Sequence, residues 1–496
     1  MGKAAMRNKL QVMKFGGTSV GDSECIRRAA EIIARASLES AVLVVVSAMS
    51  GVTNQLVLAA QQSVSGDDTE SREIAAALRN QHSAAVTALI KDEARHSQLA
   101  LEVEEITGEV TSLCRGITLL RELTPRTLAV VSSIGERLSA RLMAGALNEL
   151  GVRSEAIEAT EVIITDDDYG QAEPLMEQVR ERATSRLGPL LGEGITPVVT
   201  GFIGATAEGA LTTLGRGGSD YSATVLGAAL DADEIIIWTD VDGVLSTDPR
   251  LVPEARLLRE ISYNEAAELA FFGAKVLHPK TLRPVAEAGI PVWIRNSFAP
   301  ETPGTRITQT GRPTNNGVRG ITAIANVSLI TVGGRGIVGV IGVAAKTFQA
   351  VASVRANVLL ISQSSSENDI CFIVDSADAA RTLKALRNAF ASDLVHHDVE
   401  HITVNSEIAI VAVVGDRMRG TPGIAGRTFS ALGRRGINII AIAQGSSEYN
   451  VSFVVAASAT REAVAAVHDE FNLHLRSSRF ESEESVRGSA WVPQIV

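Results

Sequence analysis

Short runs of apolar residues alternate with longer amphipathic segments over roughly the first 300 residues of the chain. The runs are rich in β-branched residues and lack polar alternation, which predicts strands that are buried on both faces. We expect such strands at Leu10–Phe15, Ala41–Ser47, Pro197–Gly201 and Glu234–Trp238, and a helix over Ser23–Ala36. Parallel sheets covered by helices have this pattern, so the first part of the chain is predicted to be a three-layer α/β domain.

Two other stretches break this alternation. Between Thr69 and Leu123 the chain is rich in Ala, Glu, Gln and Leu and has almost no glycine, which predicts a helical excursion from the sheet. Ala299–Val318 gathers prolines, glycines and asparagines, which are typical of turns. We therefore expect a linker or domain boundary over that second stretch.

The last third of the chain contains an ungapped internal repeat with an offset of 81 residues, running from the pair Gly339/Gly420 to the pair Phe390/Phe471. Each copy predicts the order strand, helix, strand, turn, strand, helix, and a final strand at Glu400–Val404 is plausible. Two βαββαβ units are therefore expected, with small sheets that pair side by side and leave ligand sites at their junction. The other expected strands are Leu329–Val332, Val358–Gln363, Ile370–Val374, Ile408–Val414, Ile439–Gln444 and Val451–Val455.

Composition narrows the classes of partner. The 496 residues include 46 Lys and Arg against 57 Asp and Glu, a net charge of −11, so no nucleic-acid partner is expected, although a local basic pocket could bind a nucleotide. No membrane association is expected, because no apolar run approaches ~20 residues and the N-terminus lacks the apolar region of a secretory signal. The three cysteines (Cys25, Cys114 and Cys371) have no metal or disulfide spacing, so free thiols and a cytoplasmic location are expected.

Three loops rich in glycine and charge follow predicted strands, at the positions where open α/β sheets bind ligands. They are Lys14–Ser19 (KFGGTS), Gly215–Tyr221 (GRGGSDY) and Thr239–Arg250. Glycines between a strand and a helix let backbone N–H groups approach an anion. Together the loops predict a nucleotide-phosphate site. Singly, each has a structural alternative: a glycine turn with a surface lysine for Lys14, and a helix N-cap for Asp220.

The first two loops, together with Ser47–Asn54 (SAMSGVTN), Trp238–Gly243 (WTDVDG) and Phe272–Pro279 (FGAKVLHP), resemble the motifs of aspartate kinase and occur in the same order. The two repeats look like the tandem ACT regulatory domains of that family, and the resemblance extends from about Val12 to Leu473. It implies an α/β, three-layer amino-acid-kinase fold with a mostly parallel sheet over residues 8–310. Two ferredoxin-like ACT domains would follow at 320–404 and 405–480.

The resemblance implies that the chain phosphorylates the side-chain carboxylate of L-aspartate with ATP and Mg²⁺, giving 4-phospho-L-aspartate. This is the first step of lysine, threonine and methionine biosynthesis. A carboxylate with a pKa near ~4 is already ionised at pH 7, so no general base is required. The enzyme must supply alignment and charge neutralisation. The lack of a convincing Ser–His–Asp or metal-histidine set in the sequence fits this chemistry, and no metal-ligating residues are expected, because Mg²⁺ readily keeps its waters.

By the same resemblance, Lys14 would contact the transferring phosphoryl group and Asp220 would orient Lys14. Arg216 would bind a substrate carboxylate and Glu136 the α-ammonium, although a glutamate before a helical run is usually just a solvated charge. Further substrate contacts are expected from Ser47, Thr53, Gly217, Gly218 and Ser219. The ATP site would comprise Lys14, Phe15, Gly16, Gly17, Thr239, Asp240, Leu245, Arg250, Lys275 and Val276, with Gly16 and Gly17 as backbone donors.

One residue departs from the family pattern. Leu245 stands where relatives commonly have a tyrosine, which puts a stacking contact to the nucleotide in doubt. We expect somewhat weaker ATP binding as a result, without loss of activity.

The repeats supply polar groups that suit a free amino acid as effector. These are Asn357, Gln363, Ser365, Ser366 and Glu367 in the first copy, and Asn438, Gln444, Ser446, Ser447 and Glu448 in the second. The pattern looks more like the threonine-inhibited branch of the family than the lysine-inhibited one, and the alternative is that these residues only satisfy a hairpin turn. ACT units bury sheet edges against a second chain, so a homodimer or homotetramer is expected.

Three alternatives remain at this point. One is an amino-acid sensor without phosphoryl transfer, which the presence of Lys14, Arg216 and Asp220 disfavours. Another is a kinase for a different acidic amino acid, which the C-terminal repeat and Glu136 disfavour. The third is fusion to a homoserine dehydrogenase, which is not expected because only 23 residues follow Leu473.

Overall fold

The structure is a computed structural model that describes residues 9–273, 277–312, 314, 317–334, 341–363, 369–418, 420–445 and 449–475. The chain forms two compact units. The first unit comprises Met1–Val244, Leu257–Phe271 and Lys275–Arg312. The second comprises Leu245–Arg256, Phe272–Ala274 and Pro313–Val496. Compared with the predicted 8–310 domain, two internal segments therefore belong to the second unit.

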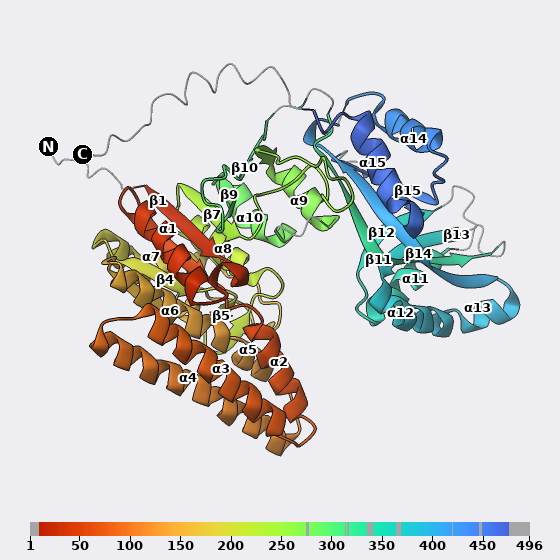
Figure 1. Cartoon of the computed structure of the whole chain (residues 1–496). Coiled ribbons are helices and arrows are strands. Elements are labelled where there is room, and N and C mark those ends of the chain that lie inside the picture. The colour runs from red at the N-terminus through yellow and green to blue at the C-terminus, as the bar shows by residue number, and fades with distance from the viewer. Residues whose placement is uncertain are drawn as a thin grey trace, which may run out of the picture. The chain divides into compact units, whose positions relative to one another are not determined.

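The first unit is built on an eight-stranded sheet with the order β3-β4-β2-β1-β7-β9-β10-β8 (Figure 1). Neighbouring strands are parallel except β9 and β10, which are antiparallel. The carboxyl ends of β4, β2, β1 and β7 consequently lie along one edge. The strands are β1 (Leu10–Phe15), β2 (Ala41–Val46), β3 (Ser154–Ile157), β4 (Thr196–Thr200), β7 (Glu234–Thr239), β8 (Glu260–Ser262), β9 (Val292–Asn296) and β10 (Thr305–Thr308), and β5 (Ile203–Ala205) and β6 (Leu211–Thr213) form a separate pair.

Both faces of this sheet are covered, as continuous apolar strands require. Met13 and Phe15 belong to a core that also contains residues of α1 (Ser23–Ser37) and α6 (Ile134–Glu149). The alternate residue Val12 faces α8 (Gly218–Ala229) on the other side, where Gly227 leaves room for Ile235. The other helices of the unit are α2 (Val52–Ser63), α3 (Thr69–Leu89), α4 (Glu93–Leu120), α5 (Pro125–Ser132), α7 (Met176–Gly192), α9 (Tyr263–Phe271) and α10 (Pro279–Ala288), with short 3₁₀ turns η1 (Gly17–Val20) and η2 (Ala159–Glu161).

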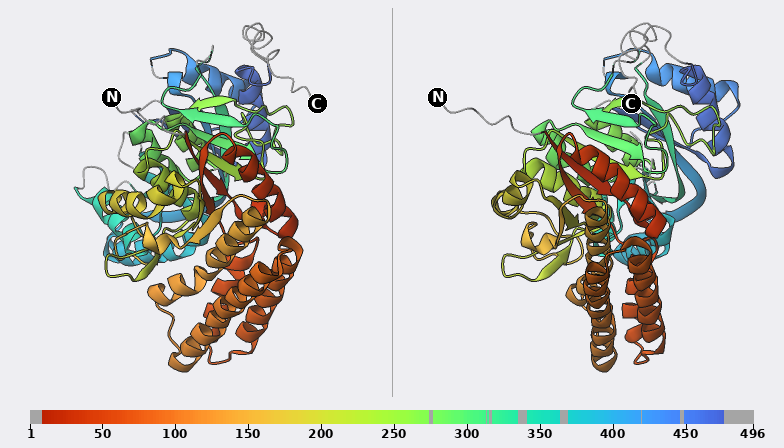
Figure 2. Two further views of the ribbon diagram at one scale, coloured as in Figure 1. Left: turned by 90° about the vertical axis from the view of Figure 1, so that its left-hand side faces the viewer. Right: turned by 60° about the vertical axis from the view of Figure 1, so that its left-hand side comes forward.

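The helical excursion predicted between Thr69 and Leu123 is confirmed. Helices α3 and α4 occupy this stretch, and with α2 and α5 they form the helical layer that extends away from the sheet (Figures 1 and 2). The predicted linker at Ala299–Val318 was wrong in part, because β10 lies inside it and pairs with β8 and β9. Ile307 at the centre of β10 is fully buried, and this burial stabilises a four-residue strand between turns rich in glycine and proline.

The second unit contains one continuous six-stranded sheet with the order β12-β13-β11-β14-β16-β15. The two central strands, β11 and β14, are each 14 residues long and antiparallel to each other. The strands are β11 (Gly320–Gly333), β12 (Val358–Gln363), β13 (Asp369–Asp375), β14 (His401–Val414), β15 (Ala441–Ala443) and β16 (Asn450–Ala456). The helices are α11 (Val343–Ser353), α12 (Ser376–Ala389), α13 (Ala391–His396), α14 (Ile424–Arg434) and α15 (Thr460–Glu470), with 3₁₀ turns η4 (Asp416–Met418) and η5 (Ala457–Ala459).

The long strands change how the two repeats are assembled. The predicted strands Glu400–Val404 and Ile408–Val414 are one strand, β14, so the expected domain boundary at 404/405 falls inside it. The beginning of β11 pairs with the end of β14, and Ile321 packs in the core of the second repeat with Phe453. The beginning of β11, which precedes the first repeat in sequence, therefore completes the second repeat.

The two repeats nevertheless place equivalent residues in their hydrophobic cores. In the first core the Phe348 and Phe372 rings meet edge to face at 5.7 Å, and in the second the Phe429 and Phe453 rings do so at 6.1 Å. These two pairs occupy equivalent repeat positions. All three cysteines are free, as expected. None of the helices in the described residues is long and apolar enough to cross a membrane.

Candidate active site

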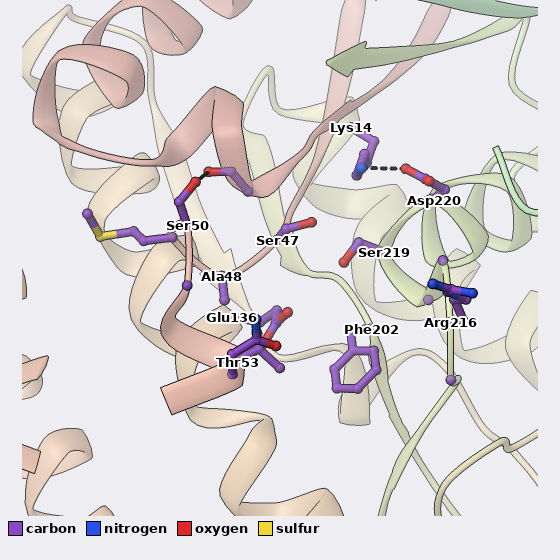
Figure 3. A pocket seen from close by; sticks show the side chains of 17 residues that line it. Lys14, Ser47, Ala48, Ser50, Thr53, Glu136, Phe202, Arg216, Ser219 and Asp220 are labelled. Carbon is purple, nitrogen blue, oxygen red and sulfur yellow. Dashed lines mark hydrogen bonds and ion pairs between the residues drawn. The ribbon is translucent and has the colours of Figure 1, made fainter. Parts of the chain in front are cut away.

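A cavity of about 400 Å³ opens at the carboxyl edge of the first unit's sheet (Figure 3). It lies where β1, β2 and β4 end and where α2, α6 and α8 begin. Its lining consists of Lys14, Gly17, Ser47, Ala48, Met49, Ser50, Gly51, Thr53, Asn54, Glu136, Phe202, Gly215, Arg216, Gly217, Gly218, Ser219 and Asp220. Ten of the predicted site residues thus come together from four separate stretches of sequence.

Lys14 and Asp220 form a buried ion pair at the inner end of the cavity. Lys14 lies on the central strand β1 and is only 8% exposed, so the alternative of a surface lysine does not hold. Asp220 lies in the first turn of α8, whose N-cap is Gly217, so Asp220 is not the cap either. The pair places one ammonium group beside a helix N-terminus, where an anion is favoured.

The loop before α8 depends on its glycines. Gly217 has φ +72°, in the left-handed region that favours glycine, and it turns the chain into the helix. A Cβ atom on Gly218 would lie 2.7 Å from the ring of Phe202, so this backbone can approach the β4 loop only as glycine. The loop presents Arg216 to the cavity, and within the described residues its guanidinium forms no ion pair.

Glu136 enters the cavity because Gly135 lets α6 begin against the loop after β2. A Cβ atom on Gly135 would lie 2.6 Å from the Ala48 side chain and 2.9 Å from that of Val52. Glu136 is 3% exposed, and its Oε2 atom has no hydrogen-bond partner. Burial raises the pKa of Glu136 from 4.5 to about 8, although the Ala48 backbone partly opposes the shift by hydrogen bonding to the carboxylate.

Glu136 and Arg216 lie around the same cavity as Thr53 and Phe202 (Figure 3). A carboxylate without a cation and a guanidinium without an anion are complementary to the two charged groups of an amino-acid backbone. Ser47 follows β2, and Ser219 packs so closely on Gly201 that a Cβ atom there would lie 2.6 Å away. Both serines provide hydroxyl groups to the cavity wall.

Two of the residues predicted for the nucleotide do not fulfil their predicted role through this cavity. The N–H group of Gly16 donates to the Trp238 carbonyl at 3.1 Å, so it is not the free backbone donor that was expected. Phe15 is fully buried and stacks on Trp238 with ring centroids 6.0 Å apart, which makes it a core residue. Gly17 does line the cavity.

The remaining nucleotide predictions lie elsewhere. Thr239 and Asp240 follow β7, beside β1, and are bonded to each other at 3.2 Å, but they do not line the cavity. Leu245 and Arg250 belong to the second unit, where Arg250 pairs with Asp248 at 2.7 Å. Lys275 and Val276 lie outside the described residues.

The predicted effector residues are described only in part. Asn357 and Asn438 precede the edge strands β12 and β15, and Gln363 and Gln444 lie at the ends of these strands, all four exposed to solvent. The two edge strands approach each other within the second unit. Ser365, Ser366, Glu367, Ser446, Ser447 and Glu448 lie outside the described residues.

Sequence reasoning missed Phe202, which the structure places in the cavity wall. Its φ of +69° is rare for a bulky residue, and in Figure 3 its ring lies between Thr53 and Arg216. Its position directly after a strand end was a usable signal, but its backbone conformation was not readable from the sequence. Ser50 and Asn54 also line the cavity, and both lay inside the SAMSGVTN motif.

Comparison with known proteins agrees with this geometry. Residues 9–296 match the amino acid kinase family, and residues 330–390 and 411–471 each match the ACT domain, in the register of the 81-residue repeat. The chain is 37% identical over 477 residues to a bifunctional aspartokinase/homoserine dehydrogenase of Daucus carota, covering 93% of this chain and 50% of that protein. It is 34% identical over 475 residues to aspartokinase 1 of Arabidopsis thaliana, covering 93% of this chain and 80% of that protein.

Solved structures give the same result. Aspartokinase III of E. coli in complex with aspartate and ADP, called the R-state, superimposes with a TM-score of 0.77 at 33% identity, covering 93% of this chain and 99% of the other. The same enzyme with lysine and aspartate, called the T-state, gives a TM-score of 0.76 at 32% identity and the same coverage. This chain spans about half the length of the bifunctional relatives that it matches.

The buried carboxyl group of Glu136 makes a prediction about stability. Its folded-state pKa of about 8 exceeds its ordinary value of 4.5, so between these values the folded chain holds a proton that the unfolded chain has lost. The stability contributed by this group is complete below about pH 4.5 and is lost as the pH rises through about 8. We expect Glu136→Gln to unfold at a higher temperature than the ligand-free parent chain at pH 8.5, with a smaller difference at pH 5.5.

Thermal unfolding at a series of pH values measures this difference. Glu208→Gln, which changes an exposed glutamate of the same unit, is the matched control and should follow the parent curve throughout. A difference between Glu136→Gln and the parent that does not grow with pH would contradict the assignment of a desolvated carboxyl group.

Proposed function

Because the chain belongs to the aspartokinases of the amino acid kinase family, we propose that it transfers the γ-phosphoryl group of ATP to the side-chain carboxylate of L-aspartate. The products are 4-phospho-L-aspartate and ADP. The observation that carries the proposal is one cavity that contains a buried Lys14–Asp220 pair together with unmatched Glu136 and Arg216 side chains. The aspartate and ADP bound to the structurally similar E. coli enzyme support the same substrate pair.

The charges of the cavity assign an orientation to aspartate. Glu136 accepts the α-ammonium group, because an entering cation lowers the cost of ionising this desolvated carboxyl group. Arg216 binds a substrate carboxylate through its planar fork. Ser47, Thr53 and Ser219 supply hydroxyl contacts, and the backbone at Gly217 and Gly218 closes the wall behind them. Both ends of the amino acid are then fixed, which aligns the β-carboxylate for attack.

Phosphoryl transfer then requires charge neutralisation and no proton transfer. The substrate carboxylate is ionised at pH 7 and attacks the γ-phosphorus atom directly. Lys14 stabilises negative charge on the transferring group, and Asp220 holds the lysine in position. The N-termini of α2 and α8 face the same cavity and add their positive dipole ends. Thr239 and Asp240, with Leu245, Arg250, Lys275 and Val276, remain our proposed nucleotide contacts.

We propose that Mg²⁺ binds together with the nucleotide. Of the two carboxylates in the cavity lining, Asp220 is paired with Lys14 and Glu136 is desolvated, so the lining offers few ligands for a cation. This donor set fits a magnesium ion that is coordinated chiefly by phosphate oxygens and water. When bound, the ion would neutralise charge on the phosphates of the nucleotide.

The activity is tested by trapping the acyl phosphate with hydroxylamine in the presence of ATP, Mg²⁺ and L-aspartate. We expect aspartyl hydroxamate from the parent chain and at least a ~100-fold loss of kcat for Lys14→Met, because a charge stabilising the transition state is removed. For Glu136→Gln we expect a ~10- to 100-fold rise in the KM for aspartate that exceeds its effect on kcat.

Two controls make this assay decisive. Glu208→Gln should retain the parent constants, since that side chain is exposed and lies outside the cavity. L-glutamate in place of L-aspartate tests the alternative of a different acidic substrate. Hydroxamate formation from glutamate but not from aspartate would identify glutamate as the substrate. Absence of product from both amino acids would favour the alternative of an amino-acid sensor.

The regulatory half is proposed to bind an end-product amino acid, with threonine favoured and lysine second. Residues of the two ACT segments that suit an α-carboxylate and α-ammonium occur at equivalent repeat positions, and Asn438 and Gln444 are exposed beside β15. The lysine complex of the E. coli enzyme supports the second candidate. The effector would act as a coupling free energy between two sites.

We expect threonine or lysine to inhibit hydroxamate formation. Asn438→Ala and Gln444→Ala should each raise the half-inhibitory concentration at least ~10-fold, because a hydrogen bond to a charged ligand is lost. Gln349→Ala, an exposed glutamine of α11, is the control and should leave inhibition unchanged. Lysine inhibition without threonine inhibition would reverse the order of the candidates, and insensitivity to both would refute the regulatory proposal.

We further propose a homo-oligomer formed through the sheet edges of the second unit. Ile361 on β12 and Ile442 on β15 occupy equivalent repeat positions and are 51% and 45% exposed, although both lie on edge strands. An edge strand with exposed apolar side chains is a template for pairing with another chain. A dimer is the smallest assembly that meets this requirement, and a tetramer is the next.

Light scattering of the full chain tests this assembly. We expect a mass of at least two chains for the parent and a lower mass for the double variant Ile361→Asp/Ile442→Asp. Val395→Asp places the same charge on an exposed apolar residue of α13 and should keep the parent mass. A monomeric parent chain would contradict the proposal.

The biological setting belongs to the same proposal. We place the reaction at the entry to lysine, threonine and methionine biosynthesis. We place it in the cytoplasm, where three unpaired cysteines remain reduced.

A further inference from the structure

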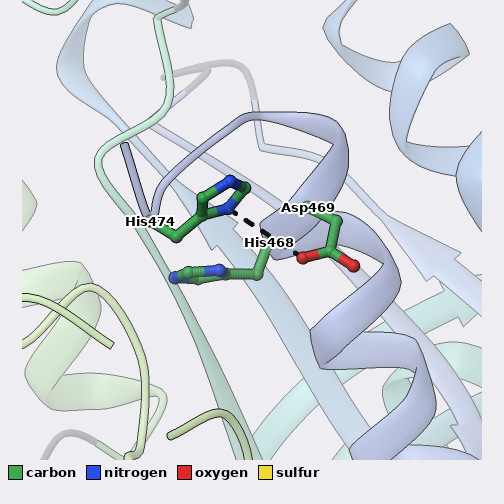
Figure 4. Close-up of side chains that lie close together, drawn as sticks. All are labelled: His468, Asp469 and His474. Carbon is green, nitrogen blue, oxygen red and sulfur yellow. Dashed lines mark ion pairs between the residues drawn. The ribbon is translucent and has the colours of Figure 1, made fainter. Parts of the chain in front are cut away.

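Two histidines and an aspartate come together at the end of α15 in the second unit (Figure 4). One ligand atom from each of His468, Asp469 and His474 lies within 4.8 Å of the other two. His468 and Asp469 are consecutive on α15, whereas His474 follows the turn that ends the helix. Asn472 in this turn has φ +50° and reverses the chain direction, as asparagine commonly does after a helix. The turn is what returns His474 to the helix end.

His468 is the member of this cluster that needs an explanation. Its side chain is fully buried, yet its Nδ1 atom has no hydrogen-bond partner among the described residues. Leaving a buried polar atom unpaired costs ~1–3 kcal/mol. Its other ring nitrogen, Nε2, lies 3.1 Å from the Ser246 hydroxyl. The ring is therefore held on one side and unpaired on the other.

We propose that His468, Asp469 and His474 form a binding site for a divalent transition-metal ion of the Zn²⁺ class, with water as a further ligand. Two imidazole nitrogens and one carboxylate oxygen are a ligand set that zinc, cobalt and nickel accept. The unpaired Nδ1 atom of His468 then becomes a ligand. Ser246 acts as the outer partner that fixes the ring orientation, in the way that metal-bound histidines are usually held.

The hydrogen bonds around Ser246 are consistent with the required tautomer. The Ser246 hydroxyl oxygen accepts a hydrogen bond from the Arg256 backbone N–H at 3.0 Å and has a second lone pair available. With a metal ion on Nδ1, the proton of His468 resides on Nε2 and is donated to that lone pair. Metal binding would thereby tighten the contact between α15 and Ser246, in the segment Leu245–Arg256 of the same unit.

The exposed side chains of the cluster can move to bring the three ligand atoms within bonding distance of a metal ion. A zinc ion lies ~2.0–2.2 Å from nitrogen and oxygen ligands, so the three atoms must draw closer than in the unliganded arrangement. His474 and Asp469 are 35% and 57% exposed and can change rotamer, whereas the buried His468 stays in place. The Nδ1 atom of His474 already lies 4.0 Å from Oδ1 of Asp469.

The surrounding charges also permit a cation. Glu254 and Arg256 are the charged groups near His468 from the Leu245–Arg256 segment. Arg256 donates from its Nε to the Leu473 carbonyl at 2.6 Å. Arg435 approaches the outer oxygen of Asp469 at 3.8 Å and also lies 4.0 Å from Glu462. Three carboxylates thus face two guanidinium groups, which leaves one negative charge for a divalent ion.

Cobalt absorption tests the site on the full chain, purified without a polyhistidine tag, treated with EDTA and kept reduced. We expect one equivalent of Co²⁺ to give visible d–d bands without the near-ultraviolet thiolate band, and Zn²⁺ to displace it. Asp469→Asn and His474→Gln change partly exposed side chains, so folding should be retained. Each should weaken Co²⁺ binding at least ~100-fold, because loss of outer-shell partners alone costs 10- to 100-fold.

His401→Gln is the matched control, because His401 also lies beside an aspartate in this unit, 3.7 Å from Asp369, but has no third such ligand among the described residues. It should bind Co²⁺ like the parent chain. Hydrogen exchange provides a second readout: Zn²⁺ should slow exchange in the segment Leu245–Arg256 of the parent and not of His474→Gln. Absence of stoichiometric binding, or binding that His474→Gln leaves unchanged, would overturn the proposal, whatever the activity of the enzyme.

Discussion

The ion pair between Lys14 and Asp220 is the interaction on which the candidate active site depends. Lys14 is on the central strand of the sheet, and strand geometry directs its side chain toward α8 rather than toward the apolar core on the other face. A buried ammonium group without a partner would cost several kcal/mol, and the first turn of α8 supplies the partner. Gly217 and Gly218 let the chain turn into this helix in close contact with His278 and Phe202.

Glu136 is a second buried ionisable side chain in this cavity, but among the described residues no cation pairs with it. Its burial raises the pKa of the carboxyl group to about 8, and the unliganded protein loses stability because of this burial. Arg216 across the cavity is the complementary case of a cation without an anion. With the amino-acid substrate that we propose, such a site discriminates strongly, because a ligand that lacks either charge leaves a desolvated group unpaired.

Much of this could be predicted from the sequence, for identifiable reasons. Continuous β-branched runs predicted β1, β2, β4 and β7, since a strand covered on both faces has no polar alternation to confuse the pattern. Glycine-rich loops at the ends of these strands predicted a phosphate site, whereas the roles of the individual residues, and the choice of Ser47, Thr53 and Glu136, came from the resemblance to aspartate kinase. Gly16 was assigned a free N–H that in fact bonds to Trp238, because strand-to-strand hydrogen bonds between distant segments leave no local signal.

The errors in the second unit have a similar origin. The polar residues Asn405–Glu407 interrupt the apolar pattern, so β14 was read as two strands, although all three are exposed within one continuous strand. The pairing of β11 with the end of β14 joins residues far apart in sequence. The proximity of His468 and His474 depends on the left-handed turn at Asn472, which their spacing alone does not reveal.

The chain also connects the second unit, which we propose to bind the effector, directly to the proposed nucleotide contacts. The segment Leu245–Arg256 leaves the first unit at Val244, directly after the proposed nucleotide residues Thr239 and Asp240, and returns to it at Leu257. Within the second unit Ser246 bonds to His468 and to the backbone of Ile321 at the start of β11. β11 is shared by both repeats. A change in the pairing of the repeats can therefore reach the proposed nucleotide residues through the backbone, because the segment Leu245–Arg256, which follows these residues, is part of the second unit.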